Sequence, residues 1–300
     1  MNRRLEGKAA IVTGSGQGIG KAIALELARQ GAKVVTNSRS PGTKGGDAAS
    51  TAQEIAELGG QAIACYADVS DFDDAGRLVQ TAADTFGRLD ILVNNAGIVR
   101  DHLVFNMTEE EWDVVIKVHL YGHFYMIRHA CNIFRRQRHG RIINTSSIAG
   151  LGLTIGQANY AAAKEGIVGL TRMVARDMAR LGVTCNCIRP NAGTRLTLSD
   201  EIKAAWTKSG MEQAIRQLEQ FKPEDVAPLV VWLASDEAAN VNGRTFAVQT
   251  GKIALYSEPV EERTITADVP WTTDDVFARL PSITGDLTNP TERRAKSVKL

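Results

Sequence analysis

The stretch AAIVTGSGQGIG, residues 9–20, places an apolar run of strand type directly before a cluster of four glycines. Residues 21–29, KAIALELAR, follow with good helix formers. Glycine has no Cβ atom, so a glycine-rich turn can bend tightly and let the backbone approach a ligand closely. The stretch therefore predicts a strand, a tight turn and a helix, in that order.

The glycine-rich turn is a candidate site for an anionic ligand. The first amides of a helix have no partner within the helix, and the helix dipole favours negative charge there. A glycine cluster alone is a weak signal, but a place between a strand and a helix is typical of a nucleotide pyrophosphate site. The candidate residues of this turn are Gly14, Ser15, Gly18, Ile19 and Gly20.

Further apolar runs of strand length continue the pattern at residues 33–37, 62–68, 91–94, 141–146, 183–188 and 244–248, with longer helical stretches between them. Such alternation indicates right-handed βαβ units. We expect a single α/β domain over residues 1–255, in which helices cover both faces of a doubly wound parallel sheet in three layers. This architecture binds ligands at the carboxyl ends of its strands.

The last part of the chain, residues 256–300, has a different character. Its periodicity fades, prolines recur, and residues 292–296 are mostly charged. We expect an extended tail with one short helix near Thr273–Arg279. The final Val298-Lys299-Leu300 matches a peroxisomal address only in part, so we do not count it as targeting.

Composition excludes several classes of protein. Lys and Arg number 35 against 34 acidic residues, so no strong field attracts nucleic acid or an anionic membrane. Cys65, Cys131, Cys185 and Cys187 form no C-x-x-C pair, which predicts buried thiols in a reducing compartment and no metal site. No apolar run reaches the roughly 18 residues that a membrane helix needs. We predict a cytoplasmic protein.

Tyr160 and Lys164 are four positions apart and so share one face of a helix, a spacing that on its own usually marks an exposed helical pair. Ser147 precedes Tyr160 by thirteen positions, just after the strand predicted over residues 141–146. An ammonium about 4 Å from a phenol favours the phenolate by on the order of 4 kcal/mol at an effective dielectric of about 20. Tyr160 could then exchange a proton with a substrate oxygen that Ser147 also hydrogen-bonds.

The order of these motifs resembles that of the short-chain dehydrogenase/reductase family, which has a Rossmann-like fold. The shared features are T-G-x-x-x-G-x-G at residues 13–20, Asp68-Val69 after the third strand, N-N-A-G at residues 94–97 after the fourth, and the Ser, Tyr and Lys just described. The resemblance implies an NAD(P)-dependent oxidoreductase that interconverts a secondary alcohol and a ketone. It implies catalytic roles for Ser147, Tyr160 and Lys164, of which the last two also contact the cofactor. It adds the cofactor contacts Asp68, Val69, Asn95, Ala96 and Gly97.

Single residues in these motifs also have plainer interpretations. Asp68 could be a turn or cap residue, and the asparagines at 94 and 95 could form an ordinary turn. Ser146 could serve as a helix cap, although the family's thirteen-residue offset selects Ser147 instead.

His119 departs from the family pattern. Residues 108–137 predict one long helix, opened by Thr108 and Glu111 in a capping-box pattern, with His119 on its buried face. Most family members have asparagine here, where it holds a helix distortion and a water linked to the lysine. His119 is therefore either a packing residue or a member of a proton relay, for which imidazole is suited. His123 is expected to pack or to face solvent.

The second predicted strand leads into Ser38 and Arg39. NAD-dependent relatives have aspartate at the position of Ser38, where it binds the ribose 2′-hydroxyl. Here a 2′-phosphate would meet a hydroxyl and a cation, which favours NADP. NAD stays an alternative, because Gln17 occupies a position where NADP-preferring relatives often have a basic residue.

Four stretches give a narrower resemblance: VHL at 118–120, GQANY at 156–160, PNAGTR at 190–195 and APLVVWL at 227–233. They resemble the (3R)-hydroxyacyl-CoA dehydrogenase domain of multifunctional enzyme type 2 and its bacterial single-domain relatives. This implies a 3-hydroxyacyl or 3-oxoacyl thioester of CoA or an acyl carrier as substrate, in either direction. It also implies nicotinamide contacts at Pro190, Ala192 and Gly193, which could otherwise be an ordinary turn.

Two other functions remain open. The substrate could be a cyclic, steroidal or other small secondary alcohol, because residues 196–221 cannot be interpreted from one sequence. A non-catalytic nucleotide-binding protein is a remote alternative, since Ser147, Tyr160 and Lys164 are all present. The family resemblance further implies a homodimer or homotetramer, packed through the helices that carry His119 and Tyr160.

Overall fold

The computed structural model describes residues 3–42, 46–194 and 212–287, together with residues 198, 203–204, 207–208 and 210. The segment 196–221 thus lies partly outside the described residues, and residues 292–300 lie wholly outside them. The chain divides into two compact units, Met1–Tyr256 and Ser257–Leu300.

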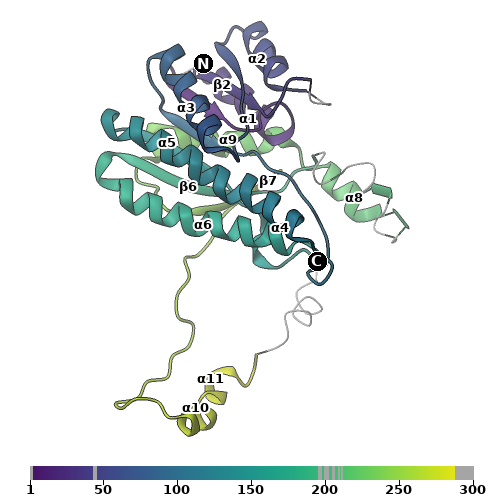
Figure 1. Ribbon diagram of the computed structural model, residues 1–300, viewed down its shortest axis with the longest axis vertical. Helices are drawn as coiled ribbons and strands as arrows, with labels where there is room; N and C mark the ends of the chain where they lie inside the picture. Colours follow the sequence, from purple (N-terminus) through teal and green to yellow (C-terminus); the bar gives the residue numbers. More distant parts are fainter. Residues whose placement is uncertain are drawn as a thin grey trace. The chain divides into compact units, whose positions relative to one another are not determined.

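Within the described residues, the first unit is built on one eight-stranded sheet in the order β3-β2-β1-β4-β5-β6-β7-β8 (Figure 1). All neighbours pair in parallel except β7 and β8, which are antiparallel. The strands are β1 Ala9–Val12, β2 Lys33–Ser38, β3 Ala62–Tyr66, β4 Ile91–Asn94, β5 Gly140–Thr145, β6 Val183–Pro190, β7 Thr245–Gln249 and β8 Lys252–Leu255.

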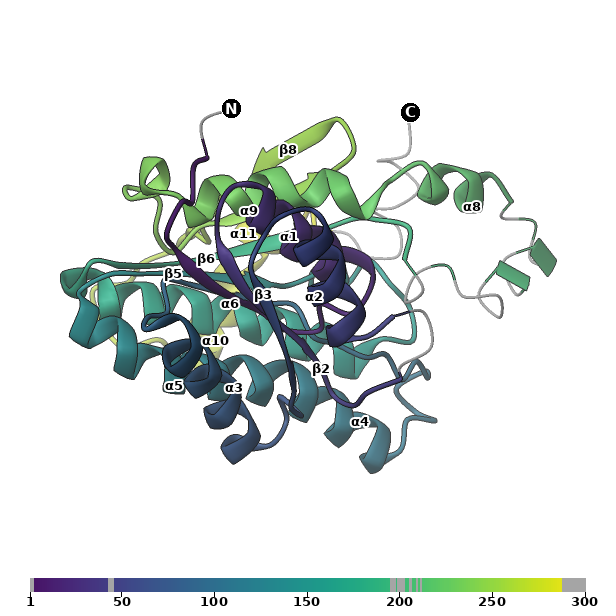
Figure 2. The ribbon, with the colours of Figure 1, turned by 90° about the horizontal axis from the view of Figure 1, so that it is seen from above.

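Helices cover both faces of this sheet, which confirms the predicted three-layer α/β fold. Figure 2 shows α1 and α9 on one face and α3, α5 and α6 on the other. Each layer has its own apolar core, for example Ile23 with Val230 on the first face and Leu78 with Met126 on the second. The helices of this unit are α1 Gly18–Arg29, α2 Ala48–Glu57, α3 Phe72–Phe86, α4 Glu109–Ile116, η1 Lys117–Tyr121, α5 Gly122–Gln137, η2 Ile148–Leu151, α6 Ala158–Met178, η3 Ala179–Leu181, α8 Glu212–Glu219, η4 Pro223–Val226, α9 Ala227–Ala234 and η5 Asp236–Ala238.

Seven of these strands lie where the alternation predicted them, with ends that differ by one or two residues. Strand β8 was missed, because its four residues follow β7 after only Thr250 and Gly251 and carry little apolar pattern of their own. Gly251 has a φ of 72°. The left-handed conformation of this glycine allows the short hairpin that ends the parallel sheet.

The helix predicted over residues 108–137 is present, but it is not uniform. Thr108 and Glu111 form the expected reciprocal capping box. A single π-helical turn, η1, then separates α4 from α5 and contains His119. Such turns occur mostly at functional sites, because they shift the helix by one residue and re-aim its side chains.

The second unit contains α10 Thr273–Arg279 and α11 Pro281–Thr284, and α10 coincides with the short helix predicted in the tail. Thr272 caps α10 in a reciprocal box with Asp275. The Arg279 guanidinium lies 4.7 Å from the centre of the Trp271 ring. These local contacts order the segment around α10.

Among the described residues, no helix has both the length and the apolar character needed to cross a membrane. In that same part of the chain, no group of three or more His, Cys, Asp or Glu side chains could hold a metal ion. The four cysteines are unpaired; Cys65, Cys185 and Cys187 are buried, whereas Cys131 is only partly so.

A buried carboxylate ties together the amino ends of β1 and β4. Asp90 is 0% exposed and accepts the main-chain N–H of Ala9 at 2.9 Å. It also accepts two hydrogen bonds from Arg88, both at 2.7 Å. The N–H of Ala9 and the guanidinium of Arg88 both donate to this one carboxylate, so loss of its charge would affect both strands.

We expect Asp90→Asn to lower the free energy of unfolding by roughly 1–3 kcal/mol, since it removes a buried carboxylate charge that the half-exposed Arg88 and the N–H of Ala9 both bind. Urea unfolding followed by circular dichroism would measure the change. The control is Asp84→Asn, which changes an exposed carboxylate on α3 and should change stability by less than about 0.5 kcal/mol. Equal effects of the two substitutions would contradict the structural role of Asp90.

Candidate active site

The glycine-rich turn between β1 and α1 is held from the side of β4. The hydroxyl of Thr13 accepts the main-chain N–H groups of Asn95 at 2.9 Å and Ala96 at 3.0 Å. The amide of Asn95 donates to the carbonyls of Thr13 at 3.1 Å and Gly14 at 3.3 Å. Asn94 and Asn95 therefore do more than form a turn: Asn95 fixes the conformation of the glycine loop.

Asn37, which sequence reasoning missed, supports the same turn from β2. Its side-chain oxygen accepts the N–H of Gly14 at 3.1 Å, and its main chain exchanges two 2.8 Å hydrogen bonds with Ser15. Its amide nitrogen donates to the carbonyls of Cys65 and Ala67. An asparagine directly after the apolar residues of β2 was the available signal, because a polar side chain that the fold buries needs partners.

We call the glycine turn and the first amides of α1 the glycine cradle; its chemistry suits a pyrophosphate. A methyl group on Gly14 would lie 2.8 Å from the Cα of Ala96, and one on Gly20 would lie 2.4 Å from the carbonyl oxygen of Gly14. Side chains at either position would therefore disrupt the packing of the turn. Gln17, the N-cap of α1, makes no side-chain capping hydrogen bond. The first amides of α1, at Gly18, Ile19 and Gly20, thus have no side-chain cap and can face an anion.

Ser38 and Arg39 lie beside this cradle at the end of β2. The Ser38 hydroxyl accepts the first amide of α2, from Ala48, at 3.1 Å. Arg39 is exposed. Asp68 lies beyond the neighbouring β3 and accepts the N–H and the hydroxyl of Ser70 at 2.9 and 2.6 Å. The turn role considered for Asp68 is therefore present, and the adjacent Val69 is buried.

Ser147, Tyr160 and Lys164 come together at the carboxyl end of β5 and the start of α6. The Lys164 ammonium lies 5.3 Å from the centre of the Tyr160 ring and donates to the carbonyl of Thr145 at 2.7 Å. The Ser147 hydroxyl accepts the N–H of Ala149 at 3.1 Å, as the N-cap of η2. Ser146 instead donates from its buried hydroxyl to the carbonyl of Lys164 at 2.7 Å. Ser146 thus anchors the catalytic helix, and Ser147 faces the tyrosine.

Burial dominates the ionisation of the pair. It raises the pKa of the Tyr160 phenol to about 12, against which hydrogen bonding with Ser147 acts to lower it. Burial also lowers the pKa of the Lys164 ammonium to about 7. The lowering of the phenol pKa expected from Lys164 is therefore not seen in the protein alone. At neutral pH Tyr160 is a protonated phenol, the form that can donate a proton.

His119 lies against Tyr160, with the ring centres 5.0 Å apart and the rings nearly perpendicular. Its Nε2 lies 2.7 Å from the carbonyl oxygen and 3.1 Å from the nitrogen of Ile98. Its Nδ1 is buried and has no protein partner among the described residues. Burial and then the charge of Lys164 keep the pKa of His119 well below its usual value, so the ring is neutral.

The neighbouring His123 is buried, so it packs and does not face solvent. Its Nδ1 donates to the carbonyl of His119 at 2.7 Å, one turn back along the helix. The His119 ring is accommodated by Gly97. A methyl group on Gly97 would lie 2.3 Å from the Cε1 of His119.

The segment after β6 completes the site. Asn191 donates its main-chain N–H to the carbonyl of Val248 at 2.9 Å, and Gly193 donates to the carbonyl of Phe221 at 2.7 Å. A methyl group on Gly18 would lie 3.6 Å from the Thr194 Cγ2 atom. The predicted nicotinamide segment, Pro190–Gly193, therefore leads to the amino end of α1, and the structure brings it beside the glycine turn.

Asn159, also missed from the sequence, braces Tyr160. It is 0% exposed and donates to the carbonyls of Arg100 and Glu111, both at 2.9 Å. Its side-chain oxygen accepts the N–H of Tyr160 at 2.7 Å. One amide thus connects the loop after β4, helix α4 and the first turn of α6. Its place next to the tyrosine was a possible signal, but sequence alone gives no partners for it.

Two loops beside Ser147 and Tyr160 expose apolar side chains. Residues 98–107 and 148–157 meet at a bridge between His102 and Gln157, and Gln157 donates to Asp101 at 2.9 Å. Val104, Phe105 and Ile155 are 71%, 78% and 77% exposed. We define the apolar rim as Leu103, Val104, Phe105, Leu151, Leu153 and Ile155.

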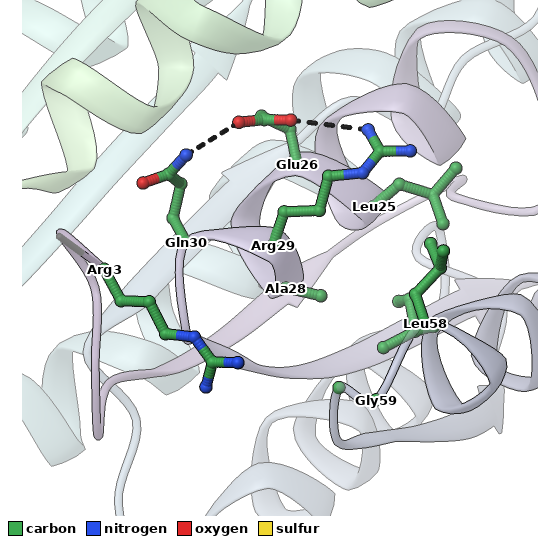
Figure 3. A pocket seen from close by; sticks show the side chains of 10 residues that line it. Arg3, Leu25, Glu26, Ala28, Arg29, Gln30, Leu58 and Gly59 are labelled. Carbon is green, nitrogen blue, oxygen red and sulfur yellow. Dashed lines mark hydrogen bonds and ion pairs between the residues drawn. The ribbon is translucent and has the colours of Figure 1, made fainter. Parts of the chain in front are cut away.

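A separate cavity of about 380 Å³ lies at the other end of α1 (Figure 3). It is lined by the last turns of α1 and α2 and by Arg3, and Glu26 there bonds to both Arg29 and Gln30. It contains none of the predicted site residues. The chemistry lies at the carboxyl ends of the strands, as the fold class implies.

A glycine cradle at α1, with a buried lysine and a partly buried tyrosine and serine at the same edge of the sheet, is the arrangement of an oxidoreductase that acts on CH–OH groups with a nicotinamide cofactor. Comparison with known families makes this specific. The chain belongs to the short-chain dehydrogenase/reductase family, since a family model described as Enoyl-(Acyl carrier protein) reductase matches residues 14–252. The resemblance inferred from the motifs is thereby confirmed.

Curated relatives extend the comparison. The chain is 43% identical over 289 residues to the hydroxyacyl-CoA dehydrogenase ChsB1 of Mycobacterium tuberculosis, covering 92% of this chain and 88% of that protein. It is 42% identical to mouse peroxisomal multifunctional enzyme type 2 over 83% of this chain, but only 32% of that protein. It is 40% identical to a 3-oxoacyl-[acyl-carrier-protein] reductase of Synechocystis, covering 83% of this chain and 98% of that protein.

A solved structure gives the same result for the fold. A short chain dehydrogenase from Mycobacterium avium superposes with a TM-score of 0.82 at 43% identity. The match covers 96% of this chain and 98% of that one.

We expect Gly97→Ala to destabilise the protein by roughly 1–3 kcal/mol, because the added methyl group overlaps the His119 ring. Urea unfolding would measure this. Adding His119→Asn should recover part of the loss, since asparagine is smaller.

The matched control is Gly169→Ala on α6, where an added methyl group meets nothing within 4 Å. That change should be neutral or stabilising, by up to about 1 kcal/mol. If Gly97→Ala behaved like Gly169→Ala, the contact between Gly97 and His119 would not constrain the site.

Proposed function

We propose that this protein is an NADP(H)-dependent reductase of 3-oxoacyl thioesters, which also works in reverse as a 3-hydroxyacyl dehydrogenase. The observation that carries this proposal is the cluster of Tyr160, Lys164 and Ser147 at the same edge of the sheet as the glycine cradle. The printed names of the hydroxyacyl-CoA dehydrogenase and 3-oxoacyl reductase relatives support the thioester.

When bound, the nicotinamide cofactor supplies or accepts the hydride. Residues 14–20 and the segment Pro190–Gly193 would hold it, with Asp68, Val69, Asn95, Ala96 and Gly97 beside it. Tyr160 donates its phenolic proton to the carbonyl oxygen in reduction and takes it back in oxidation. Ser147 donates a hydrogen bond to the same oxygen, where negative charge develops. Lys164, while protonated, stabilises the phenolate left on Tyr160.

His119 is a candidate for returning the proton to Tyr160. Its Nδ1 is buried without a protein partner among the described residues, and its ring touches Tyr160. Buried polar atoms of this kind are usually satisfied by water. A neutral imidazole can pass a proton through such a water because it has both a donor and an acceptor nitrogen. We propose this relay in addition to the packing of His119 against Gly97.

The apolar rim supports an acyl substrate. Its second loop, residues 148–157, directly follows Ser147 and ends three residues before Tyr160. The negative charge of Asp101, on the first loop, acts to raise the pKa of Tyr160, which indicates that this loop lies close to the phenol. Apolar side chains there can bind the hydrocarbon part of an acyl group.

The remaining proposals concern the cofactor and the assembly. Ser38 and Arg39 favour NADP, because neither is an acid that would repel a 2′-phosphate. A homodimer or homotetramer would cover the exposed Tyr121 and Phe124, on the helix that carries His119, and Met173 on α6. Cytoplasmic location stays a prediction.

The first test mixes purified protein with NADPH and either acetoacetyl-CoA or cyclohexanone, and follows absorbance at about 340 nm. We expect NADPH oxidation with the thioester, and at least a hundredfold lower kcat in Tyr160→Phe, which has no proton to donate. If only cyclohexanone were reduced, the proposal of a thioester substrate would be rejected, and the proposed reduction of a ketone with Tyr160 as proton donor would stand. Tyr66→Phe, which changes a tyrosine near α2, is the matched control and should keep activity.

The second test concerns Arg39. We expect Arg39→Ala to raise the KM for NADPH about tenfold or more, since a cation no longer faces the 2′-phosphate, and to leave the KM for NADH nearly unchanged. Arg29→Ala, at the far end of α1, is the control. Similar KM values for NADH and NADPH in the unmodified protein would argue against the cofactor assignment.

A further inference from the structure

We propose that Arg189 is a positioning residue that fixes Ser147 for the reaction. Arg189 is the second-to-last residue of strand β6 and directly precedes the segment Pro190–Gly193. The inference rests on the proposed catalytic role of Ser147. The side chain of Arg189 contacts none of the predicted cofactor-binding residues, and only its backbone is joined to Pro190.

The guanidinium of Arg189 bridges two elements of the site. Its Nη1 donates to the main-chain carbonyl of Ser147 at 2.9 Å, and its Nη2 donates to the carboxylate of Glu165 at 2.8 Å. Glu165 follows Lys164 on α6. One planar group therefore holds the peptide of Ser147 at a fixed place relative to the catalytic helix.

The aromatic ring of Tyr256 closes the arrangement from a third side. The Arg189 Cζ lies 5.1 Å from the centre of that ring, within cation–π range. Tyr256 is itself held, because its N–H donates to the carbonyl of Thr245 at 2.9 Å. The guanidinium thus has few alternative positions.

Arg189 is only 4% exposed, and its Nε is buried with no hydrogen-bond partner among the described residues. Burying a charge in this way is costly, and an apolar side chain of similar volume would often be at least as stable. Fold stability alone therefore does not explain an arginine here. Lysine would replace it only in part, since a single ammonium lacks the fork that reaches two acceptors at once.

Gly150 provides the room for this bridge. A methyl group on Gly150 would lie 2.7 Å from a carboxylate oxygen of Glu165 and 3.5 Å from the Nη1 of Arg189. The N–H of Gly150 also donates to the carbonyl of Ser147 at 3.3 Å. The first turn after Ser147 is thus built around the ion pair.

The contact to Ser147 has a direct chemical consequence. The carbonyl of Ser147 sets the orientation of its peptide, and with it the direction of a hydroxyl that is already bound by the N–H of Ala149. If the peptide rotates, the hydroxyl no longer faces the oxygen on which charge develops. Arg189 therefore acts on the transition state through Ser147, without touching substrate.

The experiment is a double-mutant cycle on kcat, with the best substrate found in the first assay and saturating NADPH. We expect Ser147→Ala to lower kcat roughly a hundredfold and Arg189→Met to lower it roughly tenfold, with KM for NADPH nearly unchanged. In the Ser147→Ala background, Arg189→Met should change kcat by less than about twofold, because the group that it positions is gone.

The control is Arg141→Met. Arg141 is equally buried, on β5, but lies at the opposite end of the strand, where it pairs with Asp236 at 3.2 Å. Its loss should lower Tm without changing kcat. If Arg189→Met does not fold, Arg189→Lys and Gly150→Ala replace it in the same cycle, and lysine should retain part of the activity.

The outcomes distinguish a failure of the proposed role of Ser147 from a failure of the positioning role of Arg189. Unchanged kcat in Ser147→Ala would reject the proposed role of Ser147 and with it the positioning role. A normal Ser147 effect with unchanged kcat in Arg189→Met, or with effects that multiply fully in the double variant, would reject only the role of Arg189.

Discussion

The interaction on which this site depends is the burial of the Lys164 ammonium between α6 and the carboxyl end of β5. Lys164 is 2% exposed, and its hydrogen bond to the carbonyl of Thr145 is short, at 2.7 Å. A buried amine, charged or neutral, needs its hydrogen-bond partners at fixed distances. Helix α6 must therefore lie directly on β5, and the hydroxyl of Ser146 holds it there through the carbonyl of Lys164. Because Tyr160 lies on the same face of α6 as Lys164, this packing of α6 on β5 also fixes the position of Tyr160.

The second constraint is steric and concerns the turn at the other half of the site. Gly14 and Gly20 approach neighbouring backbone so closely that any side chain would collide, and Asn37, Thr13 and Asn95 then fix the turn with hydrogen bonds. The two halves meet where Thr194 approaches Gly18. The geometry of the ligand site is thus set by packing between strands that are distant in sequence.

Sequence reasoning recovered what is periodic or contained in a short motif. The seven parallel strands, the capping box at Thr108 and the grouping of Ser147 with Tyr160 and Lys164 all follow from local spacing. It failed where the structure depends on distant partners. The π-helical turn at His119 has no local signature, and Asn37, Asn159 and Arg189 bind acceptors that lie 24 to 59 residues away in the chain. The phenol pKa was misjudged because burial cannot be read from a motif.

The strand order has a consequence for synthesis. Strand β1 lies between β2 and β4, so its second edge stays open until residue 94 has left the ribosome, and the hydroxyl of Thr13 lacks its donors until Asn95 and Ala96 follow. Long-range parallel pairing of this kind folds slowly and leaves strand edges exposed meanwhile. The nucleotide half can form once α1, β2, β3 and β4 exist, whereas Lys164 meets its carbonyl partner only after α6 has emerged. A growing chain therefore acquires a nucleotide cradle well before it can carry out chemistry.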